Sequence, residues 1–318
     1  MKVLYIVGVG RSGSTLLERA LGAVPGSVNV GELNAIFSRV SAQDQRCGCG
    51  ETFSGCAFWH EVGDRAFGGW GPVTERVTHL QPRVVRQRFV PLIATGLAGA
   101  TYRRELDEYL DVYRRLYEAI LAVSAAEVVV DASKSTAQLF ALCRLAELDL
   151  RVVNLVRDSR GVANSWSKPD VPKPQSQQGG VMGTYSPPRL AVLWAALQLE
   201  SAAITAATPH SARLRYEDLV ENPRASIERT LRDVDLAPAA GALDHVGAHS
   251  VTLPTSHGVA GSRTRFTTGD IELRIDDSWH TALPQWSQAV VTALTLPQLL
   301  RYGYVGPRTR TETVRASA

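Results

Sequence analysis

The feature that most constrains this chain is the glycine-rich turn GVGRSGST, residues 8–15, which directly follows the apolar run KVLYIV. A buried strand that ends in such a turn and opens a helix directs backbone N–H groups and the helix dipole at one point, where an anion binds. Gly8, Gly13 and Thr15 match the triphosphate loop G-x-x-x-x-G-K-[ST], but Ser14 replaces its lysine. The turn therefore predicts an α/β fold that binds an anion whose charge needs less neutralisation than that of a triphosphate with its metal.

Three later segments repeat the same order of a β-branched apolar run followed by a helical pattern. They are 127–133 with 135–148, 150–158 with 159–166, and 212–216 with 217–234. Short, continuously apolar strands that alternate with helices are typical of a parallel sheet covered on both faces. The sequence thus predicts an α/β, P-loop-like fold with a central parallel sheet flanked by helices. Tyrosines, leucines and an isoleucine at spacings of three and four over 101–123 predict a helix whose tyrosine stripe belongs to the core or a groove wall.

Charge and hydropathy limit the partners of the chain. The net charge is +3 and the arginines are scattered, so we expect an anionic small ligand and no nucleic acid. The first apolar stretch is too short for a signal peptide and lacks a small-residue cleavage site, so we expect a cytoplasmic protein. No window reaches the roughly eighteen uninterrupted apolar residues of a membrane span, and 190–207 is expected to form a buried helix.

Five segments together resemble the sulfotransferases that use 3′-phosphoadenosine 5′-phosphosulfate (PAPS), particularly bacterial relatives of the tyrosylprotein sulfotransferase branch. They are GVGRSGSTLLERALGAVPGSVNVGEL for the 5′-phosphosulfate, VVVDASKS for the lysine-bearing turn, VNLVRDSRGVANSW for the 3′-phosphate, LRYEDLVENP for the next strand end, and the late loop GVAGSRTRF. The matches run in family order from residue 3 to about residue 270. The departures are Ser14, where many members have threonine, and Ser262-Arg263, where Asn-Pro is common.

The resemblance implies transfer of a sulfuryl group from PAPS to a hydroxyl of a small-molecule, carbohydrate or lipid acceptor, leaving adenosine 3′,5′-bisphosphate. It implies catalytic roles for Glu32 as base, Lys134 at the leaving group and Arg11 at the non-bridging oxygens. No metal is required, because less charge moves than in γ-phosphoryl transfer. The residues that it implies for the nucleotide are Gly10, Arg11, Ser12, Gly13, Ser14, Thr15, Arg157, Ser165, Tyr216, Gly261, Ser262 and Arg265.

Other interpretations of these residues stay open at this point. A P-loop kinase for a small molecule is the first alternative, with Asp131 as the one candidate metal ligand after an apolar strand. A non-catalytic nucleotide-binding module is the second. Arg157 could instead pair with Asp158 on the surface, Arg160 could also reach phosphate, and His257 is a weaker candidate base than Glu32.

The segment RCGCGETFSGCAFWH offers four potential zinc ligands, Cys47, Cys49, Cys56 and His60, in the pattern C-x-C-x₆-C-x₃-H. Structural zinc sites usually open with a wider cysteine pair. We therefore expect a local structural site or buried thiols, and no catalytic metal. Cys143 stands alone in a helical pattern and is expected to be buried as a small hydrophobe.

The length and the order of the motifs favour one domain over residues 1–305. Segments at about 40–120 and at 168–189 have no counterpart in the matched motifs and are expected to shape the acceptor side. The second of them is rich in proline and glycine, which is typical of a functional lid or a disordered loop. Residues 306–318 are expected to form a flexible tail. No pattern assigns an oligomeric state.

Overall fold

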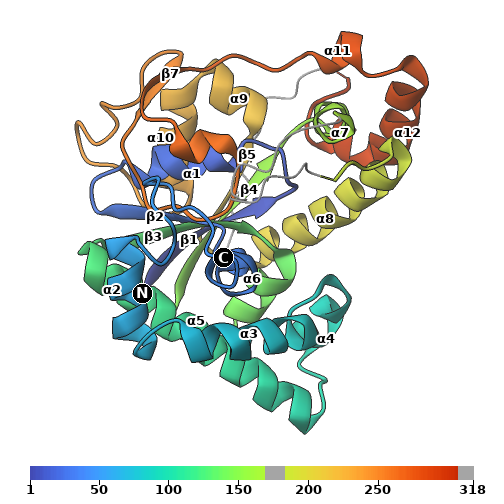
Figure 1. The fold of residues 1–318 in the computed structure, drawn as a ribbon. Helices are drawn as coiled ribbons and strands as arrows, with labels where there is room; N and C mark the ends of the chain where they lie inside the picture. The colour runs from blue at the N-terminus through green and yellow to red at the C-terminus, as the bar shows by residue number, and fades with distance from the viewer. Residues whose placement is uncertain (169–182, 307–318) are drawn as a thin grey trace.

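A computed structural model of the chain describes residues 1–168 and 183–306, and its centre is a five-stranded parallel sheet (Figure 1). The strand order is β2-β3-β1-β4-β5. The strands are β1 Lys2–Gly8, β2 Ser27–Gly31, β3 Val128–Lys134, β4 Asp149–Val156 and β5 Ser211–Arg215. Helices flank this sheet, so the predicted α/β architecture is confirmed.

The burial of both faces of strand β1 explains why its sequence is one continuous apolar run. Val3, Tyr5 and Val7 face one core, while Leu4 and Ile6 face the other, and all five are buried. A strand covered on both faces has no polar side to alternate with. The helices around the first core are α2 Ala57–Phe67, α3 Gly71–Val84, α4 Val90–Thr95, α5 Ala100–Ser124 and α6 Thr136–Leu142. Those around the second core are α1 Ser14–Gly22, α9 Tyr216–Glu221 and α10 Pro223–Asp233.

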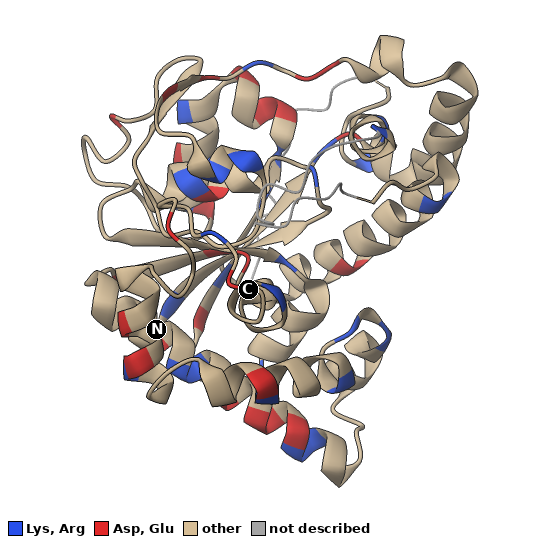
Figure 2. Cartoon of the chain, viewed as in Figure 1, with Lys and Arg blue, Asp and Glu red and all other residues tan. Residues whose placement is uncertain are grey.

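The tyrosine stripe of α5 belongs to the first core. Tyr109, Tyr113 and Tyr117 are fully buried, and the hydroxyls of two of them bond beneath the sheet edge, Tyr113 to the Leu33 carbonyl and Tyr117 to Asp131. The outer surface of α3 and α5 carries acidic and basic residues side by side (Figure 2). The ion pairs Arg76–Glu108 and Arg83–Glu105 join the two helices there.

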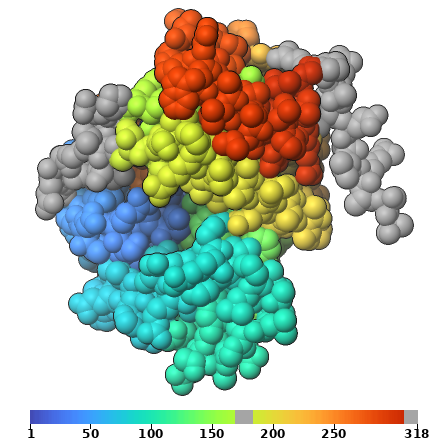
Figure 3. Space-filling model, turned by 90° about the vertical axis from the view of Figure 1, so that its right-hand side faces the viewer, coloured from blue at the N-terminus to red at the C-terminus, as the bar shows by residue number. Residues whose placement is uncertain are grey.

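A third group of helices packs beyond β4 and β5, where α12 lies against α8 (Figure 3). These helices are α7 Ser159–Ser167, α8 Pro187–Ala207, α11 Trp279–Ala282 and α12 Gln285–Arg301. Among the described helices, α8 alone has the length and apolar content of a membrane span, and 33% of its apolar stretch is buried. The prediction of a buried helix is wrong for one face of α8, where Val192 and Leu199 are 59% and 58% exposed. Trp194, on the opposite face, is fully buried in a core shared with α12.

The segment after the small antiparallel strand β6 Ser250–Leu253 crosses back to the sheet before β7 Gly269–Glu272 begins. Val259 pairs with Gly31 at the end of β2, accepts from the Glu32 N–H at 2.8 Å and donates to the Val30 carbonyl at 3.0 Å. Gly31 has φ +79°, and a Cβ there would lie 2.0 Å from the Val259 oxygen. Glycine is therefore necessary for the late segment to dock beside Glu32.

Glu32 is followed by a 3₁₀ turn, Leu33–Ala35, and a π-helix, Ile36–Ser41, and the Asn34 N–H donates to Ser133 Oγ. Two local expectations need correction. The helical pattern 217–234 divides at Asn222 into α9 and α10, with Pro223 in the first turn of α10. Helix α6 ends at Leu142, so Cys143 is exposed rather than buried. The proposed lid 168–189 and the tail 306–318 fall mainly on residues outside the described ranges.

Candidate active site

Every strand of the parallel sheet ends in a residue or loop that the sequence singled out. The glycine-rich loop follows β1, Glu32 follows β2, Lys134 ends β3, Arg157 follows β4 by one residue, and Tyr216 follows β5. The carboxyl edge of a parallel sheet is where α/β proteins bind ligands. The fold therefore gathers at one edge side chains that lie up to about two hundred residues apart in the chain.

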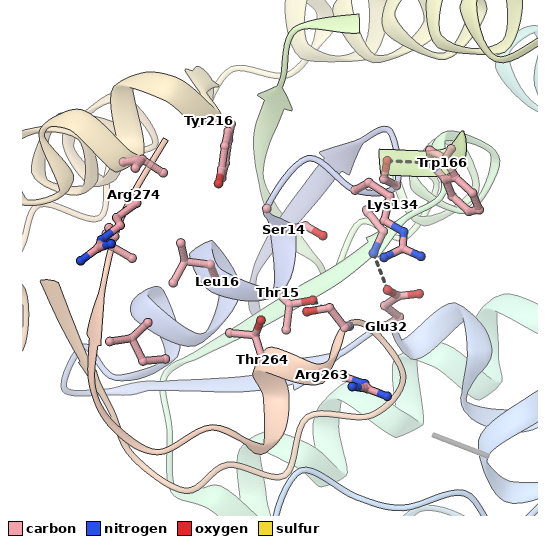
Figure 4. A pocket seen from close by; sticks show the side chains of 18 of the residues that line it. Ser14, Thr15, Leu16, Glu32, Lys134, Trp166, Tyr216, Arg263, Thr264 and Arg274 are labelled. Carbon is pink, nitrogen blue, oxygen red and sulfur yellow. Dashed lines mark hydrogen bonds and ion pairs between the residues drawn. The ribbon is translucent and has the colours of Figure 1, made fainter. Parts of the chain in front are cut away.

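A cavity of about 600 Å³ opens at this edge (Figure 4). Its volume is within the range of small-molecule and cofactor sites. The predicted residues that line it are Gly10, Arg11, Gly13, Ser14, Thr15, Glu32, Lys134, Tyr216, Gly261 and Ser262. Lining residues that the sequence analysis did not identify include Leu16, Arg39, Trp166, Arg263, Thr264 and Arg274. Trp166 donates through Nε1 to the Gly10 carbonyl, so its ring covers the start of the loop.

The loops around the cavity contain unusual backbone conformations. Arg11 and Lys134 have φ of +72° and +61°, and neither is glycine. Such conformations persist where the surrounding structure imposes them, and they concentrate at functional sites. Gly13, at φ +85°, packs so close to Tyr216 that a Cβ would lie 2.5 Å from the ring. The loop after β1 is thus locked against the residue that follows β5.

Glu32 and Lys134 form an ion pair at the cavity wall (Figure 4). Lys134 Nζ lies 2.5 Å from Glu32 Oε1 and also donates to the Ala132 carbonyl at 3.1 Å. Arg39 Nη2 approaches the other carboxylate oxygen at 3.8 Å. The Glu32 and Lys134 side chains are 17% and 14% exposed, so solvent screens this pair only partly.

Buried polar groups fix the strand ends that carry this pair. Asp131 is fully buried; it accepts from the Ser133 N–H at 2.8 Å and from the Tyr117 hydroxyl at 2.7 Å. Burial raises the pKa of Asp131 to about 6. Ser133 Oγ in turn accepts from the Asn34 N–H, two residues after Glu32. Asp131 therefore supports the fold of this edge and does not line the cavity as a metal ligand of a kinase would.

Glu18 supports the same edge from α1. Its Oε1 accepts from the Gly31 N–H at 2.7 Å and from Asn29 Nδ2 at 2.9 Å, and the side chain is buried. Desolvation raises the pKa of Glu18 from an ordinary value of 4.5 to about 7. The folded state thus binds a proton that the unfolded chain releases between these two values.

We expect Glu18→Gln to change how stability depends on pH. A raised pKa contributes stability that is complete below about pH 4.5 and is lost as the pH rises through about 7. Between pH 5 and 8 the free energy of unfolding of the unsubstituted chain should fall relative to the variant by up to about 3 kcal/mol. Urea denaturation of both proteins across this pH range measures the difference in the free energy of unfolding. The titration of Asp131 affects both proteins equally and cancels in the comparison. Parallel stability curves would contradict the prediction.

Two predicted phosphate ligands, Arg157 and Arg265, do not line the cavity. Arg157 is buried under the glycine-rich loop, donates to the Arg11 carbonyl at 2.8 Å, pairs with Asp276 at 2.9 Å and stacks over the Tyr216 ring. The surface pair with Asp158 that the sequence left open is made by Arg160 instead, at 2.6 Å. Arg157 therefore braces the loop from below in this structure.

Arg265 has a similar internal role in the late loop. It is 2% exposed and donates to the Ala260 carbonyl and, at 2.8 Å, to the Arg46 carbonyl. Burial lowers the pKa of Arg265 to about 10. The cation that reaches the cavity from this loop is Arg263, two residues earlier and exposed. The resemblance assigned Arg265 to the nucleotide, whereas in the 3₁₀ turn Arg263–Phe266 it is Arg263 that lines the cavity.

Ser12 and Ser165 are the other predicted residues outside the cavity lining. Ser12 is buried, and its hydroxyl has no hydrogen-bond partner among the described residues. Ser165 lies half-buried on α7. His257, the weaker candidate base, is also absent from the lining residues and lies among three cysteines.

Comparison with known proteins identifies the family. A family model described as sulfotransferase family matches residues 4–238, so the chain belongs to the sulfotransferase family and is a transferase by that membership. No curated protein matches the chain. The sulfotransferase domain of an olefin synthase from Synechococcus PCC 7002 is 18% identical, with 96% of each chain covered and a TM-score of 0.50. At that identity the likeness supports the fold.

A second solved structure is the sulfotransferase domain from the curacin biosynthetic pathway, at 17% identity and a TM-score of 0.48. The match covers 92% of this chain and 97% of that domain. The family expected from the sequence motifs is thus confirmed by the family model, independently of these distant structures.

Proposed function

We propose that this chain transfers a sulfuryl group from PAPS to a hydroxyl of a small-molecule, carbohydrate or lipid acceptor. The observation that carries the proposal is the ion pair of Glu32 and Lys134 beside a phosphate-type loop that lacks its lysine. This arrangement combines a candidate base, a candidate cation for a leaving group and a preformed anion site in one cavity.

The charge and shape of the cavity suit PAPS. Its basic lining residues are Arg11, Arg39, Lys134, Arg263 and Arg274, and its acidic ones are Glu32 and Glu272. The excess of positive charge and the N-terminus of α1 favour a ligand with several anionic groups. The rings of Tyr216 and Trp166 provide apolar surface for an adenine base. When bound, PAPS supplies an activated sulfuryl group, and the side chains of the cavity bind it, accept the proton and stabilise the charge that develops.

Each of three side chains has a distinct task in the proposed reaction. Glu32 accepts the proton of the acceptor hydroxyl as the new oxygen–sulfur bond forms. Lys134 neutralises the charge on the bridging oxygen as the old sulfur–oxygen bond breaks, and Arg11 with the loop N–H groups stabilises the non-bridging oxygens. Lys134 Nζ contacts the Glu32 carboxylate, so a move of the ammonium group to the leaving oxygen would free that carboxylate to act as the base.

The acceptor would approach from the side of α3 and α6. A second hollow of about 430 Å³ lies there, lined by Val85, Arg86, Gln87, Arg88, Ser135 and Ala137. Ser135 directly follows Lys134 in the chain, so one residue of this hollow is the sequence neighbour of a residue that lines the first cavity. Its lining combines apolar, amide and guanidinium groups, which suits a polar organic acceptor.

Isothermal titration calorimetry with adenosine 3′,5′-bisphosphate tests the proposal, with ATP plus Mg²⁺ as the comparison. We expect tight, metal-independent binding of the bisphosphate. Arg263→Ala should weaken it by about 10- to 100-fold, because a hydrogen bond to a charged group contributes roughly 1.5–3 kcal/mol. Arg157→Ala should weaken it as well, because Arg157 holds the Arg11 carbonyl of the glycine-rich loop. Arg232→Ala removes the same charge from an exposed pair with Glu228 and should leave the affinity unchanged.

The two alternatives predict different results, the first in this titration and the second in an activity assay beside it. Preference for ATP with Mg²⁺ would support a P-loop kinase and contradict the proposal. Tight bisphosphate binding in a protein whose activity Lys134→Ala leaves unchanged would support a non-catalytic nucleotide-binding module.

A further inference from the structure

Three cysteines and one histidine converge at a place that the proposed reaction does not use. The Sγ atoms of Cys47, Cys49 and Cys56 and a ring nitrogen of His257 all lie within 4.8 Å of one another. His60, which the sequence pattern had offered as the fourth ligand, lies on the surface with its Nδ1 3.2 Å from Asp64. The histidine that completes the cluster comes from a segment about two hundred residues further along the chain.

Four ligand-to-ligand distances in this cluster are close to those of a tetrahedral metal site. Zinc binds thiolate sulfur at about 2.3 Å and imidazole nitrogen at about 2.0–2.1 Å, so tetrahedral ligands lie about 3.8 Å apart for two sulfurs and about 3.6 Å apart for sulfur and nitrogen. Cys56 Sγ lies 3.6 Å from Cys47 Sγ and 3.7 Å from Cys49 Sγ. His257 Nδ1 lies 3.7 Å from Cys47 Sγ and 3.3 Å from Cys56 Sγ. A disulfide would instead require sulfurs about 2.0 Å apart.

The surrounding structure fixes each ligand. Residues 46–52 form a tight hairpin in which the Cys47 N–H donates to the Glu51 carbonyl at 2.8 Å and the Gly50 N–H to the Cys47 carbonyl at 3.0 Å. The His257 ring stacks on Phe58 at 4.8 Å between centroids, and its carbonyl accepts from Trp59 Nε1 at 2.8 Å. Such outer contacts orient metal ligands before the metal binds.

We propose that Cys47, Cys49, Cys56 and His257 bind one structural Zn²⁺ ion in a tetrahedral Cys₃His site. Four protein ligands close the coordination sphere, which is the arrangement of structural rather than catalytic zinc. Binding converts the three thiols to thiolates and releases three protons to solvent, while the histidine coordinates as a neutral imidazole. No oxidation or reduction is involved.

The ion would join the hairpin 46–52 to the segment that carries the late loop. The Gly48 N–H already donates to the Gly258 carbonyl at 3.0 Å, and Arg265 reaches the Arg46 carbonyl at 2.8 Å. Val259, two residues after His257, holds the backbone of Glu32. Zinc therefore fixes the position of residues 259–263 over the cavity edge. The zinc inference itself rests on these four ligands and does not depend on the reaction proposed above.

Metal analysis of the full chain, purified without chelator and dialysed against zinc-free buffer, tests the site. We expect about one zinc per chain. Cys49→Ser and His257→Ala should lose that zinc, whereas His60→Ala and Cys143→Ser should retain it. The two controls match the ligands in residue type and lie outside the cluster. Loss of zinc in His60→Ala but not in His257→Ala would overturn the assignment.

Two measurements on the unsubstituted chain cover the case in which the ligand variants fail to fold. Replacement of zinc by Co²⁺ should give the intense visible absorption and the thiolate charge-transfer band of tetrahedral sulfur coordination. Removal of zinc with a strong chelator should lower the Tm, and added zinc should restore it. A chain that holds no zinc, gains no Tm from it, and carries a Cys49–Cys56 disulfide by mass spectrometry would overturn the proposal.

Discussion

Replacement of Glu32 by glutamine is expected to lower kcat for sulfuryl transfer by about 10²- to 10⁴-fold, the range typical of a lost general base. Glutamine has nearly the same shape and can still accept the hydrogen bond from Lys134, but it cannot take the acceptor proton. Binding of adenosine 3′,5′-bisphosphate should therefore change little. Steady-state kinetics with a hydroxylated acceptor, beside calorimetry with the bisphosphate, separates the two effects.

Glu272→Gln is the matched control for this substitution. Glu272 lines the same cavity and pairs with Arg274 at 2.9 Å, so its replacement removes the same charge without touching Lys134. We expect kcat of the control to stay near that of the unsubstituted chain. An equal loss in both variants would indicate that the net charge of the cavity matters, and it would contradict a specific role of Glu32 as base.

The central fold could be predicted because its signals are local. Strands β1, β3 and β4 contain short apolar runs, and each is followed by a residue or turn that carries a distinctive polar or glycine pattern. The sequence alone shows that Ser14 stands at the lysine position of the triphosphate loop and that a lysine, Lys134, follows the apolar run of β3. Parallel strands bring their carboxyl ends to one edge, so residues after different strands are expected to meet. The cavity lined by Glu32, Lys134 and Tyr216 has this origin.

The parts that could not be predicted depend on contacts between distant segments. The sequence placed His60 with the cysteines because it is near in the chain, whereas the docking of Val259 on Gly31 delivers His257. The assignment of Arg265 to the nucleotide missed the local geometry of the 3₁₀ turn, in which Arg265 is buried and Arg263, two residues earlier, lines the cavity. The exposed face of α8 could not be predicted either, because the apolar composition of a helix does not reveal which of its sides other segments cover.

Lys134→Ala is expected to lower kcat by about 10²- to 10³-fold, the range typical of removing one donor that stabilises charge in a transition state. Alanine also carries a Cβ, so the positive φ of 61° costs it no more than it costs lysine, and the fold should persist. The affinity for adenosine 3′,5′-bisphosphate should fall far less than kcat, because the lysine acts mainly on charge that develops as the bridging oxygen leaves.

Lys134→Arg is the informative companion variant, since it keeps the charge but not the compact ammonium group that reaches Glu32 Oε1. Partial recovery of kcat in the arginine variant, with nucleotide affinity equal in both, would support charge neutralisation at the leaving oxygen. A parallel fall of bisphosphate affinity and kcat in Lys134→Ala would instead mean that the lysine binds the ground state. The pair of Glu32 and Lys134 would then serve to organise the cavity, and the base would have to be sought among the other residues that line it.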